Sequence, residues 1–84
     1  MELKVGTVTH YFSKMSAATV KITEGTLKIG DLVHIKGSTT DFQQTVESMR
    51  LYADPVEEAT EGQEVGVKVG EKVRENDVVY KVVD

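Results

Sequence analysis

Residues 25–37 read GTLKIGDLVHIKG, and this stretch decides the fold. The pair Gly30 and Asp31 predicts a tight turn, because glycine accepts a positive φ and an aspartate side chain accepts backbone N–H bonds. An earlier turn is expected at Glu24 and Gly25, with Leu27 and Ile29 packed beneath it. After the Gly30–Asp31 turn, apolar and polar residues alternate, which is typical of a half-buried strand.

The same alternation continues on both sides of this stretch and predicts six strands. They cover residues 4–9, 17–23, 32–36, 42–52, 64–69 and 78–83. The fourth strand is long, and its alternation changes phase near residues 47–49, which predicts a bulge. Residues 56–61 alone have helical spacing, and they follow a proline and stop at a glycine. One helical turn at most is expected there.

Short strands without crossover helices predict an all-β fold, namely a small six-stranded antiparallel closed β-barrel of Greek-key type. An open sandwich is the alternative, but closure leaves no exposed sheet edges. The whole chain, residues 1–84, is expected to be a single domain, because 84 residues suffice for one core and no more. The expected core residues are Val20, Ile22, Val33, Ile35, Val46, Val65 and Val67.

The amino-acid composition limits the cellular environment and the kinds of chemistry expected for this chain. The chain has no cysteine, so disulfides and thiolate chemistry are excluded. It also lacks an apolar run of membrane-spanning length and a signal-peptide core, so a cytoplasmic protein without a membrane partner is expected.

Charge is distributed unevenly along the chain. Residues 1–42 hold five lysines and four acidic residues, a balance of +1, whereas residues 43–84 hold five basic and ten acidic residues, a balance of −5. A protein with a net charge of −4 does not coat nucleic acid through its overall field. Any contact with RNA is therefore expected to be local.

Three motifs in sequence order resemble the second-domain barrel of elongation factor Tu-type translational GTPases. They are residues 25–37, the stretch TEGQEVGV at 60–67 and the stretch VRENDVVY at 73–80. Two further stretches, VGTVTHYF at 5–12 and HIKGSTTDFQQTVESM at 34–49, are similar to the C-terminal barrel of collagenase-like peptidase-family proteins. That family includes RNA-modifying factors. Because a methionine begins the chain just before the first strand, a free-standing translation elongation factor-like barrel is expected.

The residues that catalysis would require are missing. No Gly-x4-Gly-Lys-Ser/Thr loop is present, so no GTP binding is expected. His10 and His34 are the only histidines, and they lack metal-ligand spacing. Neither histidine forms a recognisable arrangement with a nucleophile. We therefore expect no catalytic residues, no metal, no cofactor and no enzyme activity.

Two segments carry the candidate binding residues. The first, residues 10–16 (HYFSKMS), places two aromatic residues, a histidine, a methionine and a lysine together, which is typical of recognition surfaces. The second is the polar segment 36–44. The candidates are His10, Tyr11, Phe12, Lys14 and Met15 in the first segment, and Lys36, Thr39, Thr40, Phe42 and Gln44 in the second.

Each segment also has a structural interpretation. Tyr11 and Phe12 could plug the barrel end, and residues 36–44 could form a solvated hairpin loop. Strand alternation nevertheless cannot bury both aromatic residues on one face, so at least one is expected to be exposed. In elongation factor Tu the loop corresponding to the first segment helps to hold the aminoacylated end of tRNA. Residues 14–16 (KMS) stand here in place of that family's Gly-Arg-Gly element.

The expected function is a non-catalytic, translation-factor-like binding module that contacts RNA (tRNA or rRNA) or a ribonucleoprotein locally. The alternative is an accessory protein-interaction subunit that docks onto a separately encoded collagenase-like peptidase-family protein or another enzyme. The resemblance favours RNA, whereas the acidic second half of the chain favours a protein partner.

Overall fold

The chain folds into β-strands and turns. A computed structural model describes residues 1–83, and no helix among them is long and apolar enough to cross a membrane. The strands are β1 (Glu2–Phe12), β2 (Ala17–Ile22), β3 (Thr26–Lys28), β4 (Leu32–Lys36), β5 (Asp41–Thr45), β6 (Met49–Leu51), β7 (Asp54–Val56), β8 (Glu58–Thr60), β9 (Glu64–Lys68) and β10 (Val78–Val82). The predicted all-β class is confirmed. The predicted number of six strands is wrong, because these residues form ten.

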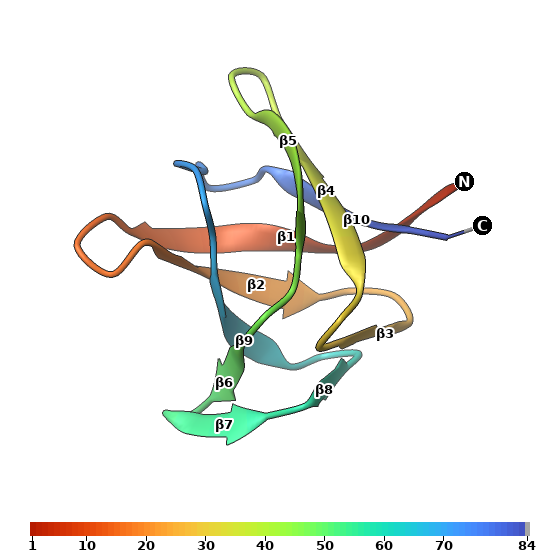
Figure 1. The fold of residues 1–84 in the computed structure, drawn as a ribbon, viewed down its shortest axis with the longest axis vertical. Coiled ribbons are helices and arrows are strands. Elements are labelled where there is room, and N and C mark those ends of the chain that lie inside the picture. Colours follow the sequence, from red (N-terminus) through yellow and green to blue (C-terminus); the bar gives the residue numbers. More distant parts are fainter. Residues whose placement is uncertain (84) are drawn as a thin grey trace.

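Eight of the strands form one strongly curved antiparallel sheet. Its order is β5-β4-β10-β1-β2-β9-β6-β7, and a separate two-stranded ribbon pairs β3 with β8 (Figure 1). The first and last long strands, β1 and β10, are neighbours in the centre of the sheet. The chain termini therefore lie together, at the opposite end of β1 from the β1–β2 hairpin (Figure 1).

The prediction of a closed barrel is corrected by this strand order. Along residues 1–83 the ladder of hydrogen bonds begins at β5 and ends at β7, and these two strands are not paired. Just after β5, the backbone of Val46 bonds to the turn that precedes β4. The Val46 N–H donates to the Asp31 carbonyl at 2.9 Å, and the Gly30 N–H donates to the Val46 carbonyl at 2.8 Å.

The same contacts explain why the long strand predicted over residues 42–52 is two strands. Val46 is fully buried, and its two backbone bonds to Gly30 and Asp31 extend the contact between the β5 and β4 segments by one residue. β5 ends before it, and β6 begins at Met49 with a new partner, β9. The predicted bulge at residues 47–49 is therefore wrong, and a break in the strand occurs instead.

The segment predicted to hold at most one helical turn, residues 56–61, contains the last residue of β7 and all of β8. β7 forms a hairpin with β6, and β8 pairs with β3 so that Ala59 lies opposite Leu27. Both of these side chains are buried in the core. A three-residue strand shows too little alternation to be recognised in a sequence.

The core consists mainly of aliphatic β-branched side chains. All seven predicted core residues belong to one buried cluster, which also contains Ala18, Leu27, Met49 and Val69. Ile29 does not pack beneath the Glu24–Gly25 turn as predicted, since 43% of its surface is exposed. The predicted turn at Gly30 and Asp31 is confirmed: Gly30 has φ +96°, and the Lys28 N–H donates to Asp31 Oδ2 at 2.9 Å.

Candidate binding groove

The β1–β2 hairpin presents the first group of predicted residues. Tyr11 is half-buried against the core, whereas Phe12 next to it keeps 43% of its surface exposed. This confirms that strand alternation leaves one of the two aromatic residues outside. The His10 ring packs edge-on against Phe12, with centroids 4.4 Å apart. In the turn that follows, Met15 is 68% exposed.

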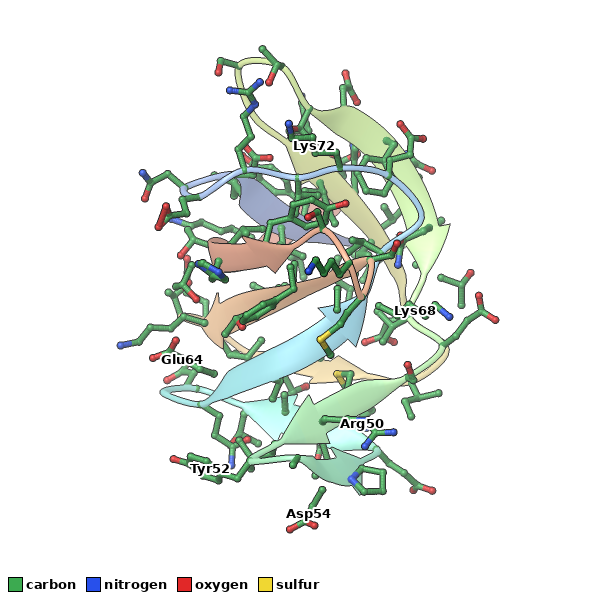
Figure 2. All side chains as sticks on the ribbon, turned by 90° about the vertical axis from the view of Figure 1, so that its left-hand side faces the viewer. Arg50, Tyr52, Asp54, Glu64, Lys68 and Lys72 are labelled. Atoms are coloured by element: carbon green, nitrogen blue, oxygen red, sulfur yellow. The ribbon has the colours of Figure 1, made fainter. Side chains whose placement is uncertain are left out.

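Beside this hairpin lies an open groove of about 500 Å³. Its floor is formed by outward-facing residues of β2 and β9, because alternate residues of these strands point into the core. Most floor side chains are small or absent. The lining residues include Ala17, Thr19 and Gly66 on the floor, Phe12 and Met15 on one wall, and Ser48, Arg50, Tyr52 and Ala53 on the other. Glu64 and Lys68 stand at the two ends of β9 (Figure 2).

Gly66 keeps the floor of the groove open. A glycine inside a strand often marks a place where another backbone approaches closely. Instead, a Cβ at this position would meet no atom nearer than the Arg50 carbonyl oxygen at 3.9 Å, an ordinary contact distance. The fold does not require a glycine at this position, and the missing side chain leaves room in the groove.

Tyr52 stands at the tip of the β6–β7 hairpin, where 92% of its surface is exposed. Tyr52 and Ala53 have φ +52° and +71°, which is the backbone of a type I′ turn. Such a turn favours Asn-Gly, and each non-glycine residue in this region costs about 1 kcal/mol or more. The Arg50 Nη1 donates to the Ala53 carbonyl at 3.4 Å and supports the turn.

Cationic groups border the groove. Arg50 and Lys68 line it, and Lys14 lies in the hairpin turn beside Met15. Within residues 1–83 the ion pairs involve Lys28, Lys81 and His34, and none involves these three cations. They are therefore available to bind an anionic group of a ligand.

The second group of predicted residues lies elsewhere. The β4–β5 hairpin projects from the end of the molecule opposite the β6–β7 hairpin (Figure 1). Lys36 and Thr39 are exposed there, but Thr40 is 5% exposed, and its carbonyl accepts a hydrogen bond from the Gly37 N–H. Phe42 is partly buried against the core, and the Gln44 side chain is hydrogen-bonded to the backbone at the end of β9 and just after it. These residues do not line the groove.

His34 lies on the outer face of the sheet between two carboxylates. Its Nδ1 is 2.7 Å from Glu2 Oε2, and its Nε2 is 2.5 Å from Asp41 Oδ1. Hydrogen bonds to Asp41 and then to Glu2 raise the pKa of His34 above 6.5, and the bond to His34 lowers the pKa of Asp41 below 3.8. No group of three or more His, Cys, Asp or Glu side chains within residues 1–83 is placed to hold a metal ion.

Sequence reasoning missed Arg50, Tyr52, Gly66 and Lys68. The first two were assigned to the last three residues of one long strand, which concealed the hairpin tip between β6 and β7. A signal existed in the dipeptide Asp54-Pro55, a turn former just after the predicted end of that strand. Gly66 and Lys68 face outward on β9, and only the tertiary structure brings them beside Phe12.

Comparison with known proteins places the chain in a family. The sequence profile described as Elongation factor Tu domain 2 matches residues 17–80. The chain belongs to this family. The resemblance to the second domain of elongation factor Tu and to the C-terminal barrel of collagenase-like proteins is thereby confirmed.

Similar curated proteins are much longer than this chain. A collagenase of Porphyromonas gingivalis is 41% identical over 81 residues, which is 95% of this chain and 20% of the relative. An uncharacterized protease of Methanocaldococcus jannaschii is 39% identical over 80 residues, which is 94% of this chain and 19% of the relative. The chain thus spans about a fifth of the length of these relatives.

A solved structure shares the fold over nearly its whole length. The C-terminal domain of a Geobacillus thermoleovorans protein assigned to the U32 peptidases superposes with a TM-score of 0.88. The superposition covers 98% of this chain and 93% of that domain, at 24% sequence identity. This chain therefore has the fold of an elongation factor Tu domain 2 and of the C-terminal domain of such proteins.

Proposed function

We propose that this domain is a non-catalytic binding module that contacts RNA, a tRNA or an rRNA, through the groove between the β1–β2 and β6–β7 hairpins. One observation carries the proposal. Of the seven large hydrophobic residues exposed within residues 1–83, three line this one groove, namely Phe12, Met15 and Tyr52. Anchor-type side chains gathered around one hollow are typical of a recognition site.

The chemistry of the walls fits an unpaired nucleotide. An exposed aromatic ring such as Phe12 or Tyr52 offers a face on which a base stacks, worth about 1–3 kcal/mol per base. Arg50 and Lys68 lie close enough to the same hollow to meet phosphate oxygens. Because the protein as a whole is acidic, these few cations define a contact of only a few phosphates.

The surroundings of the histidines support a non-catalytic role. His10 packs against Phe12, and both ring nitrogens of His34 face carboxylates. Within residues 1–83 neither ring hydrogen-bonds to a serine or threonine hydroxyl that it would activate. Among the described residues, therefore, neither histidine forms a nucleophile–base pair.

The test is a fluorescence-anisotropy titration of a labelled oligouridine and of deacylated tRNA. The double variant Phe12→Ala/Lys14→Ala is expected to bind at least about tenfold more weakly, equivalent to about 1.4 kcal/mol. Its melting temperature should change little, because both side chains are exposed. The matched control Lys36→Ala/Thr39→Ala alters exposed residues of the distant β4–β5 hairpin and should bind normally.

Two outcomes would contradict the RNA proposal. One is that neither RNA binds the wild-type chain. The other is that the Phe12→Ala/Lys14→Ala variant unfolds while its remaining folded fraction still binds, in which case these side chains plug the end of the sheet.

A second candidate function is docking onto a protein, either a separately encoded collagenase-like protein or another enzyme. The observation that favours it is that the relatives named collagenase and protease contain this domain as about a fifth of their length. Affinity capture with the chain as bait, with and without nuclease treatment, separates the two. Capture of such a protein that survives nuclease treatment and is lost in the Phe12→Ala/Lys14→Ala variant would favour docking over RNA.

A further inference from the structure

The seam between β5 and the end of β9 leaves strand edges without a strand partner. β6 pairs with β9 only at Gly66 and Val67, so the residues after them have no neighbouring strand on that side. The Val69 N–H points the other way and donates to the Ser16 carbonyl at 2.9 Å. Because backbone groups alternate along a strand, those of Lys68 and Gly70 point into the seam.

The Gln44 carboxamide binds both of these backbone groups. Its Nε2 donates to the Lys68 carbonyl at 2.8 Å, and its Oε1 accepts from the Gly70 N–H at 2.7 Å. In a parallel ladder, one residue donates to the carbonyl before its partner and accepts from the N–H after it. The side chain thus makes the two hydrogen bonds that one residue of a parallel strand would make beside Val69.

The space around this carboxamide is open. A hollow of about 420 Å³ is lined by Gln44, Thr45, Glu47, Lys68, Val69 and Gly70. On its far side β5 ends the sheet and pairs only with β4, so its outer edge also has no strand beside it. Glu47 and Lys68 offer opposite charges along the hollow, and neither forms an ion pair within residues 1–83.

We propose that this seam binds an extended peptide segment of a partner protein by strand addition, with the Gln44 side chain as the latch that the segment displaces. The segment runs parallel to residues 68–70, since that is the pattern the carboxamide reproduces. A segment carrying one basic and one acidic side chain would match Glu47 and Lys68. The group that fits the seam is a backbone peptide group, because the Gln44 side-chain amide already makes the same two hydrogen bonds there.

This peptide site shares Lys68 with the RNA groove but otherwise uses different groups. The seam is built mainly from backbone groups and Gln44, whereas the groove is built mainly from the Phe12, Met15 and Tyr52 side chains. The sign of one mutational effect distinguishes a latch from a contact residue. Removing a latch strengthens binding, and removing a contact weakens it.

The probe is a peptide selected from a displayed random dodecapeptide library on the full chain. Selected peptides are expected to shift the NMR resonances of Gly70 and of the Gln44 side-chain amide and to slow hydrogen exchange at the Gly70 N–H. Gln44→Ala should bind them about fivefold or more tightly, since the two hydrogen bonds of the latch no longer compete. Gln43→Ala, which alters the exposed neighbour, is the matched control and should bind as the wild type.

The proposal is overturned if no peptide is enriched, if selected peptides shift only groove resonances, or if a folded Gln44→Ala binds them equally or more weakly. It is also overturned if oligouridine, and not peptide, slows exchange at the Gly70 N–H. Should Gln44→Ala fail to fold, the exchange measurement on the wild-type chain decides.

Discussion

At position 66 the groove depends on the absence of a side chain. Gly66 has no backbone conformation that demands glycine, and its virtual Cβ is 3.9 Å from the nearest atom. At Gly6, by contrast, a Cβ would lie 2.2 Å from the Lys21 carbonyl oxygen of the adjacent strand. Gly66 therefore leaves room in a surface groove, whereas Gly6 allows β1 and β2 to approach closely.

Gly66→Val is expected to close the groove and preserve the fold. Valine favours a strand over glycine, on a scale of about 1 kcal/mol, so the melting temperature should hold or rise. Oligouridine binding should fall at least about tenfold, because the new side chain occupies the floor. Gly6→Ala is the contrast: it should destabilise the protein by about 1–3 kcal/mol through backbone overlap. If a folded Gly66→Val protein binds RNA as the wild type does, the groove is not the binding site.

His34 makes stability depend on pH through its two carboxylate partners. Both of its ring nitrogens face carboxylate oxygens, and only the imidazolium form donates from both. The groups that face it are Glu2 of β1, Asp41 of β5 and the neighbouring Tyr80 of β10. Asp41 above all, and Glu2 as well, raise the pKa of His34 in the folded state, so protonation stabilises the fold.

The direction of the pH dependence follows from the difference in pKa between the folded and the unfolded state. With a folded pKa above 6.5, the His34 contribution is fully present below pH 6.5 and is lost as the pH rises through the folded value. With a folded pKa below 3.8, the Asp41 contribution is present above pH 3.8 and is lost as the pH falls through its folded value. The urea midpoint should therefore decrease from about pH 6 to about pH 8 in the wild type and less so in His34→Gln. An equal decrease in both proteins would assign the pH dependence to other groups.

Among the elements, those of five or more residues were largely predicted from the sequence, and the three-residue ones were not. The strand over Leu32–Lys36 was predicted with its observed bounds, because alternation and the Gly30–Asp31 turn both mark it. β3, β6, β7 and β8 each have three residues, which is too few for a period of two to be recognised. The groove was half predicted for the same reason: its Phe12 and Met15 wall lies beside long strands, and its Arg50 and Tyr52 wall lies on short ones.

The alternation of β9 gives a prediction for that element. Val67 points into the core, with 3% of its surface exposed, and Lys68 points out. Val67→Ala should destabilise the protein by about 1–3 kcal/mol, because a cavity remains where the two methyl groups were. Lys68→Ala should stay within about 0.5 kcal/mol of the wild type. Chemical denaturation of both variants checks the assignment, and a loss below a few tenths of a kcal/mol for Val67→Ala would mean that the inward face of β9 is wrongly assigned.

For the whole molecule, the net charge of −4 limits how RNA can bind. The overall field repels phosphates, so attraction must come from the cations beside the groove, Lys14, Arg50 and Lys68. For single strands the slope of log affinity against log salt is about −0.7 per neutralised phosphate. Three contacts therefore predict a slope of about −2.

A salt series from about 50 to 200 mM separates the two kinds of contact in the groove. Lys68→Ala removes one phosphate contact, so it should flatten the slope by about 0.7. Phe12→Ala removes a stacking surface, so it should weaken binding at every salt concentration and leave the slope unchanged, because stacking releases no counterions. Lys36→Ala, on the distant β4–β5 hairpin, removes the same charge and should change neither quantity. A Lys36→Ala effect as large as that of Lys68→Ala would show that RNA responds to net charge alone. A slope of log affinity against log salt near zero for the wild type would favour protein docking as the function of the groove.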